Sequence, residues 1–359
     1  MKILFVIYSL KGGGAERVLA LIANEFSSKK HKVLIYTYLE GSVYKLNNDI
    51  IHKPIFHDSE ILTGILGNIK FFTRLKNIIE LEKPEIVISF MLGMNKKVIP
   101  VTKIVGVPVI VSEHNSYENK TGISSWIERH ILYKFADSVV ILTKYDYKKF
   151  YSKFLNNVTV IPNPLSFTPV NVLGTREKTI LAAGNLDRWS HKGLDNLLNI
   201  FYHIKKIHPE WKLKIAGEGK NGKLFLLKLV EKLDLQKDVI FLGFCEDISK
   251  ELKKSSIFVL SSRFEGFPMV LLEAMSQGCT CISFDCISGP REIIENNVDG
   301  LLIENQNMKK MKNGILRLIE DKVLCEFLAK NAIQNINRLS ISEIGNSWIE
   351  LINETIKKR

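Results

Sequence analysis

The chain has no long hydrophobic run. Of its 359 residues, 46% are hydrophobic and 25% are charged, yet no apolar stretch reaches the roughly 18 residues that a membrane span requires. The N-terminal stretch MKILFVIYSL is short and leads into KGGGAER rather than into a small-residue cleavage site, which argues against a signal peptide. The composition predicts a globular fold and excludes disordered, collagen-like and disulfide-scaffold proteins. Any membrane contact is therefore expected to be peripheral.

Cysteine is sparse and forms no recognisable pair. The five cysteines include no CxxC and have no companion histidine spacing that would cage zinc. Cys279 and Cys281 alternate in the apolar run CTCISF, where we expect buried thiols that act as small hydrophobic side chains. Reduced thiols of this kind favour a cytoplasmic protein. The chain also contains no Asp-x-Asp pair, so a metal-bridged diphosphate is not expected.

Positive charge is in excess. The formal net charge is +12, of which residues 1–170 carry +8. Such an excess favours anionic partners, namely nucleic acid, an anionic membrane surface or phosphorylated small molecules. Because no RNP-like pattern or helix-turn-helix signature is present, nucleic acid is not an expected partner.

Short β-branched runs alternate with amphipathic stretches along the whole chain, a pattern typical of repeated βαβ units with parallel sheets. The predicted strands lie near residues 2–8, 32–38, 85–90, 107–112 and 137–142, and again near 178–183, 212–216, 239–242, 256–261 and 279–284. The fold class is therefore α/β, with two doubly wound parallel-sheet domains at 1–163 and 178–340, a proline-containing linker at 164–177, and a C-terminal helix at about 341–359 that packs back on the first domain. Parallel sheets bind ligands beyond the carboxyl ends of their strands, so we expect an active site in a cleft between the domains.

The first predicted strand leads into a glycine-rich turn before a helix. Gly12, Gly13 and Gly14 lack Cβ atoms at this turn, so backbone N–H groups at the start of the helix are accessible to an anion or an oxygen-rich ligand. The alternative is a tight turn needed only for packing.

A GxGxxG sequence occurs at residues 217–222 (GEGKNG). A dinucleotide fingerprint belongs at the first βα turn of a fold, whereas this one follows the second strand of the second sheet. We therefore do not expect NAD binding, although Glu218 is expected to line a loop at the strand end.

The segment from Ser261 to Ile294 carries the strongest chemical signal. After a strand come Glu265, Gly266 and Phe267, and then Pro268 at the expected first position of a helix. Glu273 follows five residues later, about 7.5 Å along the axis at ~1.5 Å per residue. The start of a helix favours a phosphate, whereas two carboxylates favour hydroxyl groups. This combination predicts a nucleotide-sugar site.

Positive charge for a diphosphate is available after the first strand of the second domain. Residues 184–193 (GNLDRWSHKG) contain Arg188 and Lys192, and cations near a departing diphosphate stabilise the charge that accumulates as a glycosidic bond breaks. The alternative is a solvated basic loop.

These segments together resemble one enzyme family. EGFPMVLLEAM matches the E-x7-E element of retaining GT-B glycosyltransferases, and GGGAERV, SEHN, the Arg188–Gly193 segment and FDCISGPREII resemble a bacterial branch of glycosyltransferase family 4. The resemblance extends over nearly the whole chain. It implies two Rossmann-like domains, the first binding the acceptor and the second the nucleotide sugar, and transfer from a UDP-sugar to a saccharide, often one carried on a polyprenyl diphosphate.

The resemblance also assigns roles to individual residues. It implies that Glu265 binds the donor-sugar hydroxyls, Glu273 the ribose hydroxyls, and Arg188 with Lys192 the diphosphate. Gly266, Phe267 and the neighbours of Pro268 are expected to make further phosphate and sugar contacts, and Gly243 and Phe244 to contact the base. His114 is expected to lie near the reacting sugar. Many members have Gly-Arg at positions 184 and 185, whereas this chain has Asn185. Arg188 is expected to substitute for that arginine.

The expected reaction is a metal-independent, same-face transfer of a hexose or N-acetylhexosamine in bacterial surface-glycan assembly. No nucleophile with an activating base is evident, and no cofactor is expected beyond the UDP-sugar co-substrate. Residues 61–83 combine apolar and basic side chains and either lie on an anionic bilayer at the inner face of the plasma membrane or cover their own sheet. Two alternatives remain: a GT-B-type UDP-sugar epimerase, which would act without an acceptor, and a non-catalytic membrane-docked module, which would bind vesicles without turnover.

Overall fold

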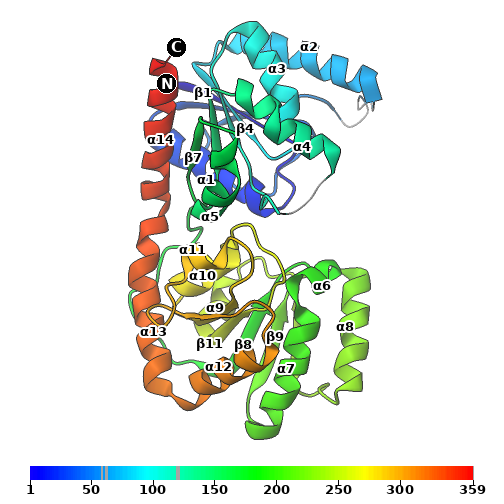
Figure 1. Ribbon diagram of the computed structural model, residues 1–359, viewed down its shortest axis with the longest axis vertical. Coiled ribbons are helices and arrows are strands. Elements are labelled where there is room, and N and C mark those ends of the chain that lie inside the picture. The colour runs from blue at the N-terminus through cyan, green and yellow to red at the C-terminus, as the bar shows by residue number, and fades with distance from the viewer. Residues whose placement is uncertain (58–59, 61–63, 119–121, 359) are drawn as a thin grey trace. The chain divides into compact units, whose positions relative to one another are not determined.

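The computed structural model describes the chain except residues 58–59, 61–63, 119–121 and 359. By its internal contacts the chain forms two compact units (Figure 1). Unit 1 contains Met1–Pro164 and Leu339–Arg359, and unit 2 contains Leu165–Arg338. Within the described residues, no helix combines the length and apolar character needed to cross a membrane.

Unit 1 is built on a parallel sheet of seven strands in the order β3-β2-β1-β4-β5-β6-β7. Its strands are β1 (Lys2–Ile7), β2 (Lys32–Thr37), β3 (Ile51–Pro54), β4 (Ile86–Phe90), β5 (Val109–Ser112), β6 (Ser138–Ile141) and β7 (Val158–Val160). Its α-helices are α1 (Gly14–Ser28), α2 (Gly64–Glu82), α3 (Asn95–Val105), α4 (Ile123–His130), α5 (Lys144–Lys149) and α14 (Ile341–Lys357), with short 3₁₀ turns η2 (Leu132–Phe135) and η3 (Tyr151–Lys153).

The C-terminal helix α14 belongs to unit 1. Ser340 caps its start by accepting the Glu343 N–H, and its Trp348 ring stacks on Phe90 of β4 with centroids 5.9 Å apart. On the same helix Thr355 lies within hydrogen-bond distance, 3.0 Å, of Ser138 of β6. The last helix of the chain therefore completes the N-terminal unit (Figure 1).

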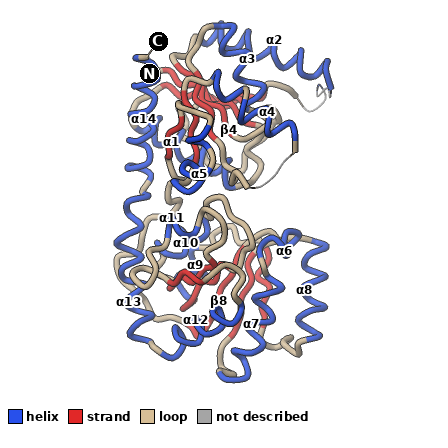
Figure 2. Tube along the Cα trace, viewed as in Figure 1, coloured by secondary structure: helices blue, strands red, loops and turns tan. Residues whose placement is uncertain are grey.

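Unit 2 contains a second sheet, whose strands are red in Figure 2. It is parallel and has six strands in the order β10-β9-β8-β11-β12-β13. Its strands are β8 (Glu177–Ala183), β9 (Lys212–Ala216), β10 (Val239–Gly243), β11 (Ser255–Leu260), β12 (Thr280–Phe284) and β13 (Leu301–Ile303). Its helices are α6 (Trp189–Lys192), α7 (Leu194–Ile207), α8 (Lys220–Lys232), α9 (Ser249–Lys254), α10 (Met269–Ser276), α11 (Pro290–Ile293), α12 (Met308–Glu320) and α13 (Lys322–Asn335), with 3₁₀ turns η4 (Leu186–Arg188) and η5 (Ile336–Leu339).

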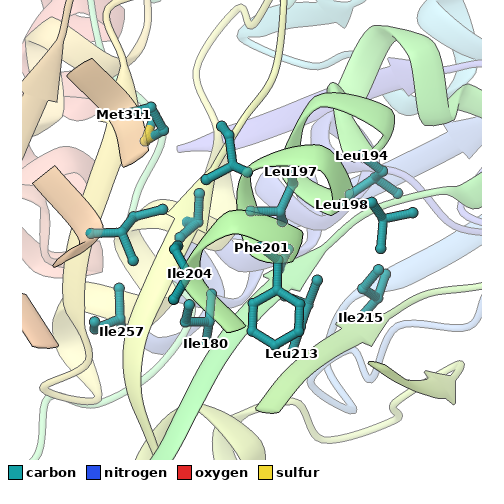
Figure 3. Packing of buried hydrophobic residues seen from close by; sticks show 14 of the residues in the cluster. Ile180, Leu194, Leu197, Leu198, Phe201, Ile204, Leu213, Ile215, Ile257 and Met311 are labelled. Carbon is teal, nitrogen blue, oxygen red and sulfur yellow. The ribbon is translucent and has the colours of Figure 1, made fainter. Parts of the chain in front are cut away.

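Helices cover both sheets, so the central strands are largely buried. In β12, TCISF, every residue is buried, as expected for a strand covered on both faces. Figure 3 shows the core of unit 2, where Leu197, Phe201 and Ile204 of α7 pack on Ile180 of β8 and Leu213 of β9.

The thiols of unit 2 behave as core side chains. Cys279 and Cys281 are fully buried and not disulfide-bonded. Burial raises the pKa of the Cys279 thiol to about 12, which makes it a poor nucleophile. The prediction that these residues pack as small hydrophobic side chains is confirmed.

The α/β fold class and all ten predicted strands are confirmed, but three strands were not predicted. β3 (IHKP) carries polar residues, and β7 and β13 have three residues each. All three are end strands of their sheets. An end strand is paired on one side only and is often short and mixed in composition, so it gives little sequence signal.

The amphipathic segment predicted at 61–83 is helical from Gly64 onward, and Ile61–Thr63 lie outside the described residues. Leu75 and Ile79 are buried against the sheet, whereas Ile65 and Ile69 are exposed. The C-terminal half of α2 thus covers its own sheet, and the N-terminal half presents apolar side chains to solvent.

Candidate functional site

The predicted site residues of unit 2 lie at the carboxyl ends of its strands or in the segments that follow them. Strand order reverses between β8 and β11, and in parallel sheets ligands bind outside the strand ends at such a point. Lys192 belongs to the segment that follows β8, and Glu265 to the loop that follows β11. The topology brings together two residues that are 73 positions apart in the chain.

Lys192 and Glu265 form an ion pair. The Lys192 Nζ lies 2.7 Å from Oε1 of Glu265, with side-chain exposures of 18% and 10%. The hydroxyl of Ser262 donates to the same oxygen over 2.6 Å. One ammonium hydrogen is used in this pair, and a lysine has three, so Lys192 retains donors for a further anion.

Two glycines fix the loops that carry this pair. A Cβ on Gly193 would lie 1.9 Å from the Ser261 carbonyl oxygen, and Gly193 has a φ of +62°. A Cβ on Gly289 would lie 2.6 Å from the carbonyl oxygen of Gly266. The segments after β8, β11 and β12 therefore approach one another through backbone atoms, and the Lys192–Glu265 pair is held by main-chain packing.

The second carboxylate, Glu273, lies within α10 and is buried. Its Oε1 accepts a hydrogen bond from the Ser166 hydroxyl over 2.6 Å. Pro268 is the N-cap of α10, with a ψ of 101°, and no side chain caps the helix. The prediction of Pro268 as the first helical residue is wrong by one position, because its extended ψ delays the helix to Met269. The first N–H groups of α10 lack partners within the helix, which suits an anion.

Arg188 contacts a different side chain from Lys192. It ends η4, is exposed, and its Nη2 lies 3.2 Å from Nε2 of His191. Burial, followed by the charge of Arg188, lowers the pKa of His191. Asn185, the residue that departs from the family pattern, caps η4 by accepting a hydrogen bond from the N–H of Asp187.

The glycines of residues 217–222 serve close packing. A Cβ on Gly217 would lie 1.9 Å from the Gly184 carbonyl oxygen, and one on Gly222 would lie 1.8 Å from that of Leu186. The Glu218 carbonyl accepts the Leu186 N–H over 2.7 Å, and Asp187 accepts the Gly222 N–H at the start of α8. The GxGxxG sequence therefore joins the ends of β8 and β9.

The predicted base contacts lie at the end of β10. Gly243 has a φ of +72°, and its carbonyl accepts the Gly217 N–H over 2.7 Å. The ring of Phe244 is exposed. A flat apolar ring is thus available at this edge of the sheet.

In unit 1, His114 follows β5. Its Nε2 lies 3.1 Å from the Ser112 hydroxyl, and its ring stacks on Phe90 with centroids 5.0 Å apart. Burial lowers its pKa to about 3, so the imidazole is neutral near pH 7. Nδ1 is buried and has no hydrogen-bond partner in the described part of the chain. The neutral His114 ring can form a hydrogen bond with a ligand, but it is a weak base.

The glycine-rich turn of unit 1 is partly occupied by the chain itself. Glu16 accepts the Gly12 N–H over 2.6 Å, and the Tyr44 hydroxyl accepts the Gly13 N–H and donates to the Gly13 carbonyl, each over 2.8 Å. A carboxylate at this turn favours a ligand with hydroxyl groups over a phosphate. Gly14 begins α1 with no atom within 4 Å of a Cβ built on it.

Several supporting residues have no distinctive sequence signal. Ser262 and Ser166 each donate to a predicted carboxylate. Arg263 forms a two-pronged ion pair with Asp195, at 2.8 Å for each contact, and so ties the loop after β11 to α7. No group of three or more His, Cys, Asp or Glu side chains within the described residues is arranged to hold a metal ion.

Comparison with known proteins identifies the family. Residues 12–167 match the family model described as Glycosyltransferase Family 4, and residues 167–335 match that described as Glycosyl transferases group 1. The chain is 30% identical over 362 residues to the GalNAc-alpha-(1->4)-GalNAc-alpha-(1->3)-diNAcBac-PP-undecaprenol alpha-1,4-N-acetyl-D-galactosaminyltransferase of Campylobacter jejuni, with 99% of each chain covered. It is 27% identical over 365 residues to the amylovoran biosynthesis glycosyltransferase AmsD of Erwinia amylovora, covering 98% of this chain and 99% of that one.

Solved structures support the fold. HepE of Anabaena, in complex with UDP, matches with a TM-score of 0.82 at 20% identity, covering 99% of this chain and 100% of that one. The lipopolysaccharide outer core galactosyltransferase WaaB matches with a TM-score of 0.78 at 21% identity, covering 99% of each chain. With two doubly wound parallel sheets, both family models and a relative aligned over its full length, the chain belongs to the GT-B glycosyltransferases of family 4.

Proposed function

We propose that the chain transfers a hexose or N-acetylhexosamine from a UDP-sugar to a saccharide carried on a polyprenyl diphosphate, with retention of anomeric configuration, in bacterial surface-glycan assembly. The observation that carries the donor assignment is the Lys192–Glu265 pair beside the uncapped start of α10. A carboxylate paired with an ammonium group, in the loop that leads into the start of a helix, matches the hydroxyl and phosphate groups of a nucleotide sugar.

Each donor group has a proposed partner. Glu265 accepts hydrogen bonds from sugar hydroxyls and Glu273 from ribose hydroxyls, while Lys192 and Arg188 neutralise the diphosphate. Further donor contacts come from the predicted residues Gly266, Phe267, Gly243, Phe244 and Glu218. Since Lys192 has hydrogens beyond the one that contacts Glu265, it can bind the diphosphate without releasing the carboxylate.

The proposed chemical step uses the leaving group as the base. The bond between the anomeric carbon and the diphosphate oxygen breaks through an oxocarbenium-like state, and UDP departs. The acceptor hydroxyl attacks from the same face, and its proton passes to the departing phosphate oxygen. Lys192 stabilises the charge that develops on that oxygen. His114, which is neutral because its pKa lies near 3, orients the reacting groups by hydrogen bonding.

The acceptor assignment draws on relatives and on surface chemistry. The names of two Campylobacter jejuni relatives describe acceptors on undecaprenyl diphosphate. On this chain, Ile65, Leu66 and Ile69 at the start of α2 are exposed next to Lys70. Apolar side chains beside a lysine suit the surface of an anionic membrane. We propose peripheral attachment through this end of α2, at the cytoplasmic face where the UDP-sugar is available.

The decisive experiment removes the two charges of the pair separately. Lys192→Met and Glu265→Gln are each expected to lower kcat for transfer from the cognate UDP-sugar by ~10²-fold or more, the typical loss when a preorganised polar contact to the transition state is removed. A second ion pair of unit 2 supplies matched controls: Lys178 and Glu210, 3.3 Å apart and largely exposed. Lys178→Met and Glu210→Gln should transfer at the wild-type rate.

Donor and stereochemistry are read out independently. Thermal shifts with UDP-, GDP- and ADP-sugars should select a UDP-sugar, since a bound donor stabilises the folded state by mass action. NMR of the product should give the anomeric configuration of the donor, and transfer should persist in EDTA. Near-wild-type activity in either Lys192→Met or Glu265→Gln would contradict the assigned donor site, whereas an inverted product would contradict the same-face step alone.

A further inference from the structure

Lys97 of unit 1 has an unusual environment. It lies in the first turn of α3, which follows β4 at the carboxyl edge of the sheet. Its ammonium group is 4.8 Å from the centroid of the Tyr38 ring and 5.5 Å from that of Phe71. The side chain is half-buried, and no carboxylate forms an ion pair with it within the part of the chain that the structure describes. A lysine removed from water is usually paired.

Glu40, two residues after Tyr38, and Glu60, the partner of Arg74 on the helix that carries Phe71, already have ion-pair partners. Glu60 accepts two hydrogen bonds from Arg74, over 2.8 and 2.7 Å, and Glu40 is paired with His57. Burial, followed by the charge of Lys96, lowers the pKa of Lys97. Burial and the neighbouring ammonium group thus both disfavour the charged form of Lys97, and the two aromatic rings provide only a partial counterweight.

A stacked pair of tyrosines contacts the same region. Tyr8 follows β1 and Tyr38 follows β2, and their rings lie 11° from parallel with centroids 5.3 Å apart. Tyr38 is buried, whereas Tyr8 is 50% exposed. Strand order reverses between β1 and β4, so Tyr8 and Lys97 flank the point where a parallel sheet binds its ligand. An exposed ring held flat by a second ring offers a platform for the C–H face of a sugar.

We propose that Lys97 binds the diphosphate of the acceptor and that the Tyr8 ring packs against the acceptor saccharide. The inference rests on the proposed function, because it takes its anion from the lipid-linked acceptor. A diphosphate would supply an anionic partner for the Lys97 ammonium group. An ammonium–phosphate contact is stronger where little water surrounds it. The Tyr38 ring contacts both proposed binding residues, Tyr8 and Lys97.

The test compares two acceptors that carry the same sugar. One is N-acetylgalactosamine joined through a diphosphate to farnesol, and the other is octyl N-acetylgalactosaminide, which is uncharged. With saturating UDP-sugar, Lys97→Met is expected to raise KM for the diphosphate acceptor by about tenfold or more, the loss for one charge-assisted hydrogen bond. Its KM for the octyl glycoside and its kcat should not change, and Lys97→Arg should restore most of the affinity.

Controls separate a binding role from a structural one. Lys32→Met removes the same charge from the first, exposed residue of β2, at the opposite edge of the sheet, and should leave both KM values unchanged. Tyr8→Ala should raise KM for both acceptors, whereas Tyr8→Phe should not. The inference alone would be overturned if Lys97→Met had the wild-type KM for the diphosphate acceptor, or if its KM rose equally for both acceptors. Failure of the wild type to use any diphosphate acceptor would overturn the proposed acceptor as well.

Discussion

The substitution Gly193→Ala tests whether backbone packing holds the donor site together. Gly193 has a φ of +62°, and an added Cβ would lie 1.9 Å from the Ser261 carbonyl oxygen and 3.5 Å from its Cβ. The neighbouring Lys192 carbonyl accepts a hydrogen bond from the Ser261 hydroxyl over 2.9 Å. Because Ser261 follows β11, any relief of the clash moves the Lys192 segment away from the loop that carries Glu265.

The expected cost has two parts. Left-handed backbone costs a residue other than glycine roughly 1–2 kcal/mol, and an inserted methyl group that forces a backbone shift costs about 1–3 kcal/mol. Together these terms predict that the free energy of unfolding of unit 2 falls by about 2–5 kcal/mol. The same shift lengthens the 2.7 Å contact between Lys192 and Glu265, so UDP affinity should fall as well.

Urea unfolding gives the change in stability, and hydrogen exchange of residues 184–193 shows where the structure loosens. Gly106→Ala is the matched control, because Gly106 has a φ of +82° but no atom within 4 Å of a built Cβ. It carries the backbone part of the cost without the clash. Equal destabilisation in the two variants, with normal UDP binding by Gly193→Ala, would show that the close approach to Ser261 does not position the site.

Two further predictions concern stability. Burial lowers the pKa of folded His114 to about 3, from its usual value of 6.5. Between these values the folded protein binds fewer protons than the unfolded chain, so stability is lost as pH falls below about 6.5. At about pH 5 this loss amounts to roughly 2 kcal/mol, and His114→Gln should lack it in urea titrations; parallel pH profiles for wild type and variant would refute the assignment. Arg176 donates to the carbonyls of Leu252, Ser255 and Gln277 over 2.8, 2.9 and 2.6 Å, at the ends of α9 and α10. Arg176→Met should therefore destabilise unit 2 by about 2–4 kcal/mol, because three carbonyls lose their hydrogen bonds. Lys178→Met removes a charge at an exposed site and should not destabilise it. Equal destabilisation by the two variants would show that the lost charge matters rather than the lost hydrogen bonds.

The sequence was sufficient for the central strands of both sheets because these are covered on both faces and read as continuous apolar runs. VIVS of β5 and SVVI of β6 are fully buried. Three of the four end strands, β3, β7 and β13, escaped prediction because they are short or polar, whereas the apolar run VIFLG of the end strand β10 was predicted. The start of α10 was misplaced by one residue, since proline fits both the N-cap and the first helical position and only its ψ distinguishes them.

For the proposed donor site, the sequence predicted residues but not their contacts. That Lys192 and Glu265 share an edge follows from parallel topology, since both come after strands. That they touch depends on Gly193 and Gly289, whose roles appear only when the carbonyls they face are known. In unit 1, Lys97 carried no signal in the sequence, because its significance lies in the absence of an acidic partner among the described residues.

The glycines of unit 2 show how one residue type can indicate a wrong ligand and still mark the right place. Residues 217–222 have the spacing of a dinucleotide fingerprint, but Gly217 and Gly222 face the carbonyl oxygens of Gly184 and Leu186. Their lack of a Cβ serves contact between the ends of β8 and β9 rather than contact with a pyrophosphate. Gly193 and Gly289 do the same for the segments after β8, β11 and β12. Because each contact joins main chain to main chain, it leaves side chains such as Lys192 and Glu265 little freedom to separate, so the proposed donor would need little reorganisation of the site on binding.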